Sequence, residues 1–86
     1  MIVYLESPQG SSPQDYLERA RLEMERVVGF RGSVVSAKVQ DSRIAVRVKI
    51  NTDWDMPAEQ KPEYLADWIR AKVRQVFTVK SISVRG

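Results

Sequence analysis

Residues 34–50, VVSAKVQDSRIAVRVKI, decide the fold of this chain. Apolar and polar side chains alternate on both sides of Asp41-Ser42, which is typical of two half-buried strands joined by a tight turn. A register shifted by one residue would turn charged side chains toward the core. The stretch therefore predicts an antiparallel hairpin with one apolar face. The expected apolar pairs are Val39 with Ile44, Ala37 with Val46 and Val35 with Val48.

The chain before the hairpin predicts a strand followed by a helix. Residues 2–5 are rich in β-branched and aromatic side chains and are followed by turn-forming residues. Pro13 suits the first position of a helix, and apolar residues recur at helical spacing over 16–28. Gly29 can adopt the left-handed conformation that ends a helix, and Phe30 is expected to fold back on the last turn.

The chain after the hairpin predicts a second helix and a closing strand. Residues 62–77 carry apolar side chains on one helical face, with a preliminary turn over 57–60. Residues 79–85 alternate again, with Ile82 and Val84 as the expected core pair.

The order strand, helix, strand, strand, helix, strand is that of a ferredoxin-like α+β sandwich. This fold has a four-stranded antiparallel sheet with both helices on one face, and the first and third strands lie at its centre. A chain of 86 residues, 43% of them apolar, suits one such domain over residues 1–86.

The composition excludes much of enzyme chemistry. The chain has no Cys and no His, the commonest thiolate and imidazole ligands and catalytic groups. Residues 51–62 begin like a calcium loop, but Met56 stands where the loop needs Gly and Pro62 where it needs Glu. We therefore expect a non-enzymatic protein without metal or cofactor. The longest apolar run, residues 1–5, is too short to span a membrane, so we expect a cytoplasmic protein.

The element order is similar to that of acylphosphatases, RNA-recognition motifs and amino-acid-sensing regulatory domains. Acylphosphatases hold phosphate with an arginine between the first strand and the first helix, whereas residues 7–13 contain neither Arg nor Lys. RNA-recognition motifs stack bases on aromatic residues of the two central strands. Here Tyr4 stands at a comparable place, but the third strand has Ala45 and Arg47.

The strand segments carry six cationic residues against the single acidic Glu6. Alternation places most of these cations on the face that no helix covers. An apolar centre with a basic rim is expected there, with Val79 at its margin. The predicted partner-binding residues are Ile2, Tyr4, Val34, Lys38, Arg43, Arg47, Lys49 and Arg85.

Three interpretations of this surface stay open. The cations can simply keep edge strands from pairing with neighbouring molecules. The apolar centre can contact a protein partner or a second copy of the chain. As an alternative, the surface can bind single-stranded RNA or DNA, with Tyr4 stacking on a base and Arg and Lys contacting phosphates.

The two tryptophans call for separate expectations. Trp68 lies on the apolar stripe of the second helix and is expected in the core. Trp54 lies in the polar linker, where it either covers the end of the core or remains exposed as an anchor for a partner. Burial is favoured, because a small domain needs the apolar area of a tryptophan.

Overall fold

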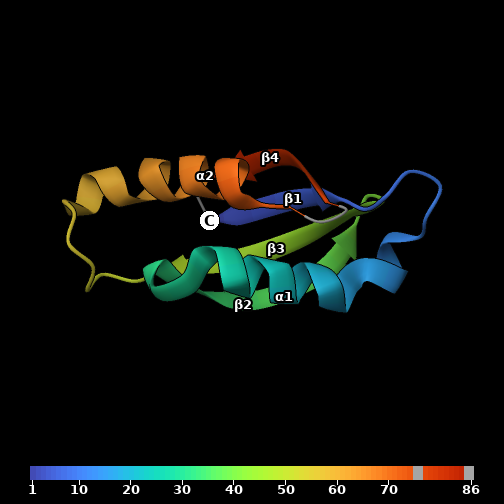
Figure 1. Cartoon of the computed structure of the whole chain (residues 1–86), viewed down its shortest axis with the longest axis horizontal. Helices are drawn as coiled ribbons and strands as arrows, with labels where there is room; N and C mark the ends of the chain where they lie inside the picture. Colours follow the sequence, from blue (N-terminus) through green and yellow to red (C-terminus); the bar gives the residue numbers. More distant parts are fainter. Residues whose placement is uncertain (75–76, 85–86) are drawn as a thin grey trace.

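The structure, a computed structural model, describes residues 1–74 and 77–84. Its elements follow the predicted order (Figure 1): β1 Ile2–Glu6, α1 Leu17–Val28, β2 Gly32–Gln40, β3 Arg43–Ile50, α2 Lys61–Lys72 and β4 Thr78–Ser83. Short 3₁₀ turns precede α1 and α2, at Pro13–Tyr16 and Ala58–Gln60. The second of these confirms the preliminary turn expected before the second helix.

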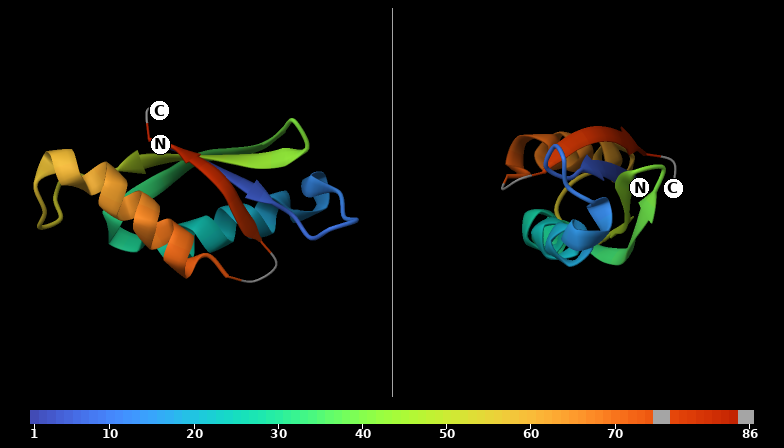
Figure 2. Two further views of the ribbon diagram at one scale, coloured as in Figure 1. Left: turned by 90° about the horizontal axis from the view of Figure 1, so that it is seen from above. Right: turned by 90° about the vertical axis from the view of Figure 1, so that its right-hand side faces the viewer.

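The four strands form one antiparallel sheet in the order β2-β3-β1-β4. Both helices pack on the same face of this sheet, and the other face is open (Figure 2). The fold is therefore the predicted ferredoxin-like α+β sandwich. Neither helix of the described chain is long and apolar enough to cross a bilayer.

The core lies between the sheet and the two helices. The sheet contributes Val3, Leu5, Ile44, Val46 and Val48, and the helices contribute Ala20, Met24, Val27, Val28, Leu65, Ala66 and Ile69. Trp68 packs against this cluster, as predicted. Asp41 and Ser42 both have positive φ angles, as a two-residue hairpin turn of type I′ requires.

The second half of the chain departs from the prediction at three places. Helix α2 ends at Lys72, five residues before the predicted end. Val84 follows β4 and is 39% exposed, so it does not join Ile82 in the core. Val79 packs on the core rather than on the open face, because the pairing of β1 with β4 shifts register at Lys80. The shift changes which side of the strand faces the helices.

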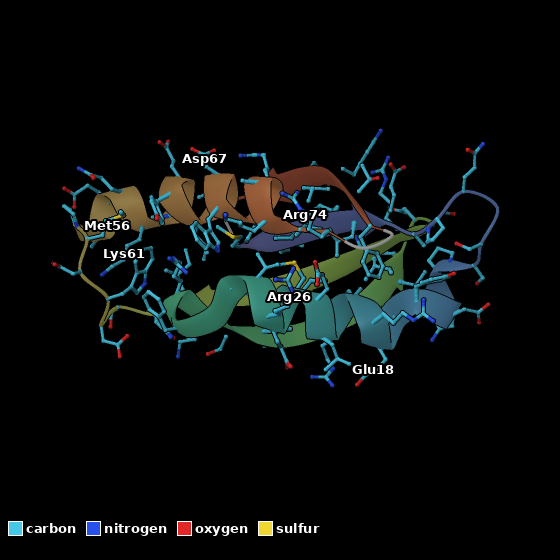
Figure 3. All side chains as sticks on the ribbon, viewed as in Figure 1. Glu18, Arg26, Met56, Lys61, Asp67 and Arg74 are labelled. Carbon is cyan, nitrogen blue, oxygen red and sulfur yellow. The ribbon has the colours of Figure 1, made fainter. Side chains whose placement is uncertain are left out.

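A buried carboxylate ties α1 to the segment that follows α2. Glu23 accepts hydrogen bonds from the Arg26 guanidinium, at 2.8 and 2.9 Å, and from the backbone N–H of Arg74, at 2.7 Å. Figure 3 shows Arg26 and Arg74 where α1 faces the end of α2. Burial raises the pKa of Glu23, but the hydrogen bonds from Arg26 and Arg74 outweigh it and hold the pKa below its ordinary value.

Glu23→Gln is expected to lower the free energy of unfolding at pH 7 by about 1.5 kcal/mol, because hydrogen bonds to a charged acceptor are replaced by weaker ones to a neutral amide. The folded pKa of Glu23 is depressed, so its stabilisation is present above the ordinary pKa and is lost as the pH falls through the folded pKa. We would measure urea unfolding at about pH 7 and at about pH 3. The free energy of unfolding should fall less between these two pH values in the variant than in the unaltered chain.

Glu25→Gln is the matched control. Glu25 pairs with Arg21 on the exposed side of the same helix, and exposed pairs contribute little to stability. Equal effects of the two substitutions would contradict a special role for the buried carboxylate.

Candidate interaction face

The open face of the sheet is built from the outward-facing residues of its two central strands. Val3 and Leu5 are fully buried toward the helices, while Ile2 and Tyr4 between them are half-buried on the opposite side. On β3, Ala45 lies opposite Tyr4 and Arg47 lies opposite Ile2. Strict alternation thus places these four side chains on one surface.

A β-bulge at Val35 shapes the outer part of this face. Val34 pairs with Val48 and Ser36 pairs with Arg47, which leaves Val35 without a partner in β3. The predicted pairing of Val35 with Val48 is therefore wrong. The extra residue reverses the alternation at this point, because a bulge sets two residues against one.

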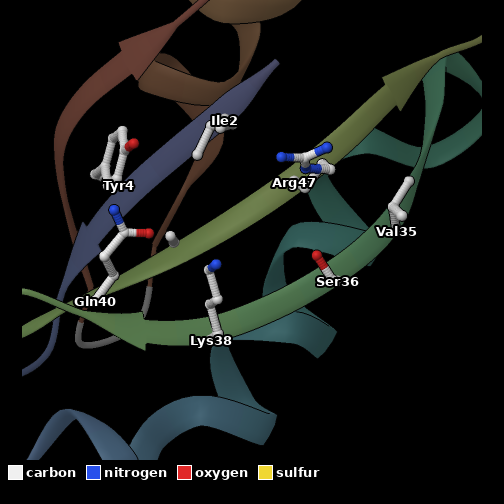
Figure 4. Close-up of a pocket in the computed structure, with 8 residues that line it drawn as sticks. Ile2, Tyr4, Val35, Ser36, Lys38, Gln40 and Arg47 are labelled. Atoms are coloured by element: carbon white, nitrogen blue, oxygen red, sulfur yellow. The ribbon is translucent and has the colours of Figure 1, made fainter. Parts of the chain in front are cut away.

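The bulge also exchanges the roles of the two valines. Val34 packs against the core, so its assignment to the partner-binding surface is corrected. Val35 is 58% exposed and lies beside Ser36 on the open face (Figure 4).

A shallow hollow of about 530 Å³ lies between β1, β3 and the bulged strand. Figure 4 shows its side chains pointing away from the helices. Its lining combines apolar side chains with two cations and neutral polar groups: Ile2, Tyr4, Val35, Ser36, Lys38, Gln40, Ala45 and Arg47. The hollow therefore has an apolar centre and a basic, hydrogen-bonding margin.

The structure brings only part of the predicted set to this hollow. Ile2, Tyr4, Lys38 and Arg47 line it. Arg43 lies opposite Gln40 at the hairpin end of β3, and Lys49 lies opposite Ser33 at the other end. Arg85 is outside the described residues.

The cations of this face have no acidic partners within the part of the chain that the structure describes. The ion pairs found there all lie on α1 and α2. Arg47 instead lies close to another positive group, the amine of Met1, which donates to the Val48 carbonyl at 3.2 Å. Burial, and then the charge of Arg47, lower the pKa of this amine. The cations that line the hollow are therefore not neutralised by ion pairs within the described residues.

The hollow offers cations and hydrogen-bonding groups to a ligand. Its lining offers a phenol, a hydroxyl, an amide and two cations, with no carboxylate among them. Among residues 1–74 and 77–84, no three acidic side chains lie close enough together to hold a metal ion.

Sequence reasoning missed Val35, Ser36, Gln40 and Ala45 as parts of the hollow. Ser36, Gln40 and Ala45 lie where the predicted hairpin register places them, in phase with Lys38 and Arg47. Val35 could not be found in this way, because the bulge that places it on the open face is a departure from alternation.

Trp54 lies at the end of the molecule where α1 ends and α2 begins. Its indole N–H donates to the Asn51 carbonyl at 2.7 Å, and its ring lies against Phe30 and Tyr64. The side chain of Trp54 is half-buried, so it is neither fully buried over the core nor fully exposed as an anchor. Phe30 is 65% exposed and contacts Trp54, so it does not fold back on α1 as predicted.

Comparisons with models of protein families, with curated proteins and with solved structures find no match.

Proposed function

We propose that this chain is a non-enzymatic interaction module whose open sheet face binds an acidic segment of a partner protein. The observation that supports this most directly is the hollow between Tyr4, Val35 and Arg47, where apolar side chains lie among cations that have no acidic partner in the described chain. An apolar centre with a charged margin is the usual anatomy of a protein interface.

Charge favours an acidic partner over a second copy. Two copies meeting through this face would bring Lys38 and Arg47 of one toward the same cations of the other. Like charges at an interface cost several kcal/mol. An acidic segment would instead pair with these cations and cover Ile2, Tyr4 and Val35.

Geometry also favours a protein over single-stranded nucleic acid. Proteins that bind single strands stack successive bases on several aromatic side chains. Tyr4 is the one aromatic residue among those that line the hollow. A base on Tyr4 would have no second ring beside it, whereas aliphatic side chains of a peptide fit Ile2, Val35 and Ala45.

The test uses a labelled peptide in which Glu and Leu alternate, titrated in fluorescence anisotropy. Arg47→Glu is expected to weaken binding at least about tenfold, because coupling energies of close charge pairs start near 1.5 kcal/mol. The matched control is Arg70→Glu, which makes the same change of charge on α2, where Arg70 pairs with Asp67. This control should bind the peptide as the unaltered chain does.

Other outcomes would contradict the proposal. Equal losses in the two variants would mean that only net charge matters. Tighter binding of an oligothymidylate, lost in Tyr4→Ala, would favour the nucleic-acid alternative. A dimer mass in light scattering that Tyr4→Asp abolishes would favour a second copy.

A further inference from the structure

Four aromatic rings gather at the end of the molecule where α1 ends and α2 begins. We call this group the end cluster, and it consists of Phe30, Trp54, Tyr64 and Trp68. Successive ring centroids lie 6.4, 5.7 and 6.4 Å apart. Figure 3 labels Met56 and Lys61 at this end of the molecule.

Hydrogen bonds fix the backbone around the end cluster. Asn51 donates its backbone N–H to the Arg31 carbonyl at 2.9 Å and its side-chain amide to the Phe30 carbonyl at 2.7 Å. The Trp68 indole donates to the Val27 carbonyl at 2.8 Å. Together with the bond from Trp54 to Asn51, these contacts hold the rings in one arrangement before any ligand arrives.

The guanidinium of Arg31 lies against three of these rings. Its central carbon is 3.9 Å from the ring centroid of Trp68, 4.5 Å from that of Phe30 and 5.9 Å from that of Tyr64. Such contacts between a cation and aromatic faces stabilise the position of the guanidinium.

Arg31 has no acceptor within the described chain, unlike three of the four arginines of the helices. Arg21, Arg26 and Arg70 each donate to a carboxylate. The Nε of Arg31 is buried and makes no hydrogen bond. The loop before α2 contains Asp53 and Asp55, yet neither forms an ion pair with Arg31.

This arrangement leaves the terminal N–H groups of Arg31 without a partner among the described residues, while its Nε is buried. A guanidinium carries its five N–H groups in its plane, so rings that contact its face do not use them. Arg31 is half-buried as a whole, which leaves part of the side chain open to solvent. The acceptor that matches two parallel N–H groups is a carboxylate or a phosphate.

The surrounding surface favours a carboxylate that belongs to a protein. Phe30 is 65% exposed and Tyr64 is 39% exposed beside the guanidinium. A ligand that brings apolar side chains next to its carboxylate would cover both rings, which inorganic phosphate would not. Trp, Tyr and Arg are also the residues that most often dominate the energy of protein interfaces.

We propose that Arg31 and the exposed rings of Phe30 and Tyr64 form a second binding site, which takes an acidic side chain flanked by apolar residues of a partner protein. The site is separate from the open face, since none of its residues lines the hollow there. Lys72, with its Nζ 4.9 Å from the Trp68 centroid, adds positive charge beside this ring.

The test follows the two indole N–H signals in NMR during titration with a peptide of sequence acetyl-Ala-Leu-Asp-Leu-Ala-amide. Both tryptophans of the chain belong to the end cluster, so these signals report on this site. The Asp peptide is expected to shift both signals, and the matching Asn peptide is expected to bind at least about tenfold more weakly, as for loss of a charge-assisted bond.

Arg31→Gln should bind the Asp and Asn peptides equally. Arg31→Lys keeps the charge without the planar donors and should bind the Asp peptide several-fold more weakly than the unaltered chain. The matched control is Arg19→Gln, because Arg19 also lies over an aromatic ring, at 5.1 Å from the Tyr16 centroid, but in the first turn of α1. It should retain the full preference for Asp.

The proposal is overturned if the Asn peptide binds as well as the Asp peptide, if Arg31→Gln keeps the preference, or if inorganic phosphate at equal concentration displaces the peptide. Arg47→Glu should leave the indole response unchanged. A loss of the indole response in that variant would assign the peptide to the open face and would also overturn the proposal. Failure of this site therefore remains distinguishable from failure of the open face.

Discussion

Leu65→Ala is expected to lower the free energy of unfolding by about 3 kcal/mol, the middle of the range for a buried leucine. Leu65 belongs to α2 and is fully buried against the sheet. Removing its side chain takes apolar area from the core and leaves a cavity that a packed interior closes only in part. Urea or guanidinium unfolding followed by circular dichroism measures the change.

Leu22→Ala is the control for this substitution. Leu22 lies in α1 and is 51% exposed, away from the apolar stripe of its helix. Its removal is expected to change the free energy of unfolding by less than about 1 kcal/mol. Similar losses in the two variants would mean that α2 does not pack on the sheet as described.

The expected loss for Leu65→Ala is large compared with the total free energy of unfolding of a small domain. Small domains bury a modest share of their surface, so their total stability is low. The same sheet supports the open face on its other side, through the strands that carry Tyr4 and Arg47. A loose core would therefore also loosen the spacing of those two side chains.

The hairpin illustrates what local pattern can predict. Residues near the turn pair as expected, with Gln40 opposite Arg43, Val39 opposite Ile44 and Ala37 opposite Val46. The turn forms without glycine, since Asp41 and Ser42 both adopt positive φ angles. The match of apolar partners across the strands was therefore a better guide than turn composition.

The bulge illustrates what local pattern cannot predict. Both Val34 and Val35 suit a strand, and either can face the core. Which of the two valines faces the core depends on how β2 packs against α1 and β3. The alternation of residues within one strand carries no information about that packing. For the same reason the sequence predicted the basic open face but assigned the wrong valine to it.

The end of α2 depends on a contact between distant residues. The apolar spacing continues past Lys72, which favoured a longer helix. In the structure the backbone becomes extended at Val73, and the N–H of Arg74 donates a hydrogen bond to Glu23 on α1. The position of Arg31 among aromatic rings is likewise a result of tertiary contacts, and no spacing along the chain indicated it.

Gly32→Ala is expected to lower the free energy of unfolding by about 2 kcal/mol, as for an overpacked site. A Cβ at this position would lie 2.6 Å from the backbone carbonyl oxygen of Lys49, and 3.1 and 3.3 Å from side-chain atoms of Val28 and Val48. The backbone φ of Gly32 is −171°, which any residue can adopt. The cost therefore comes from close approach between β2 and β3, and the oxygen that must move belongs to a paired strand.

Ser33→Ala separates this effect from a general loss at the start of β2. Ser33 is the next residue, is exposed and pairs with Lys49 in the same part of the sheet, so its substitution should leave stability within about 0.5 kcal/mol. Gly32 lies three residues before the bulge. A strand displaced at Gly32 should thus also shift the amide signals of Val35 and Ser36 in NMR and weaken binding of the acidic peptide at the open face. If Gly32→Ala were as stable as Ser33→Ala, the close contact between the two strands would be wrong.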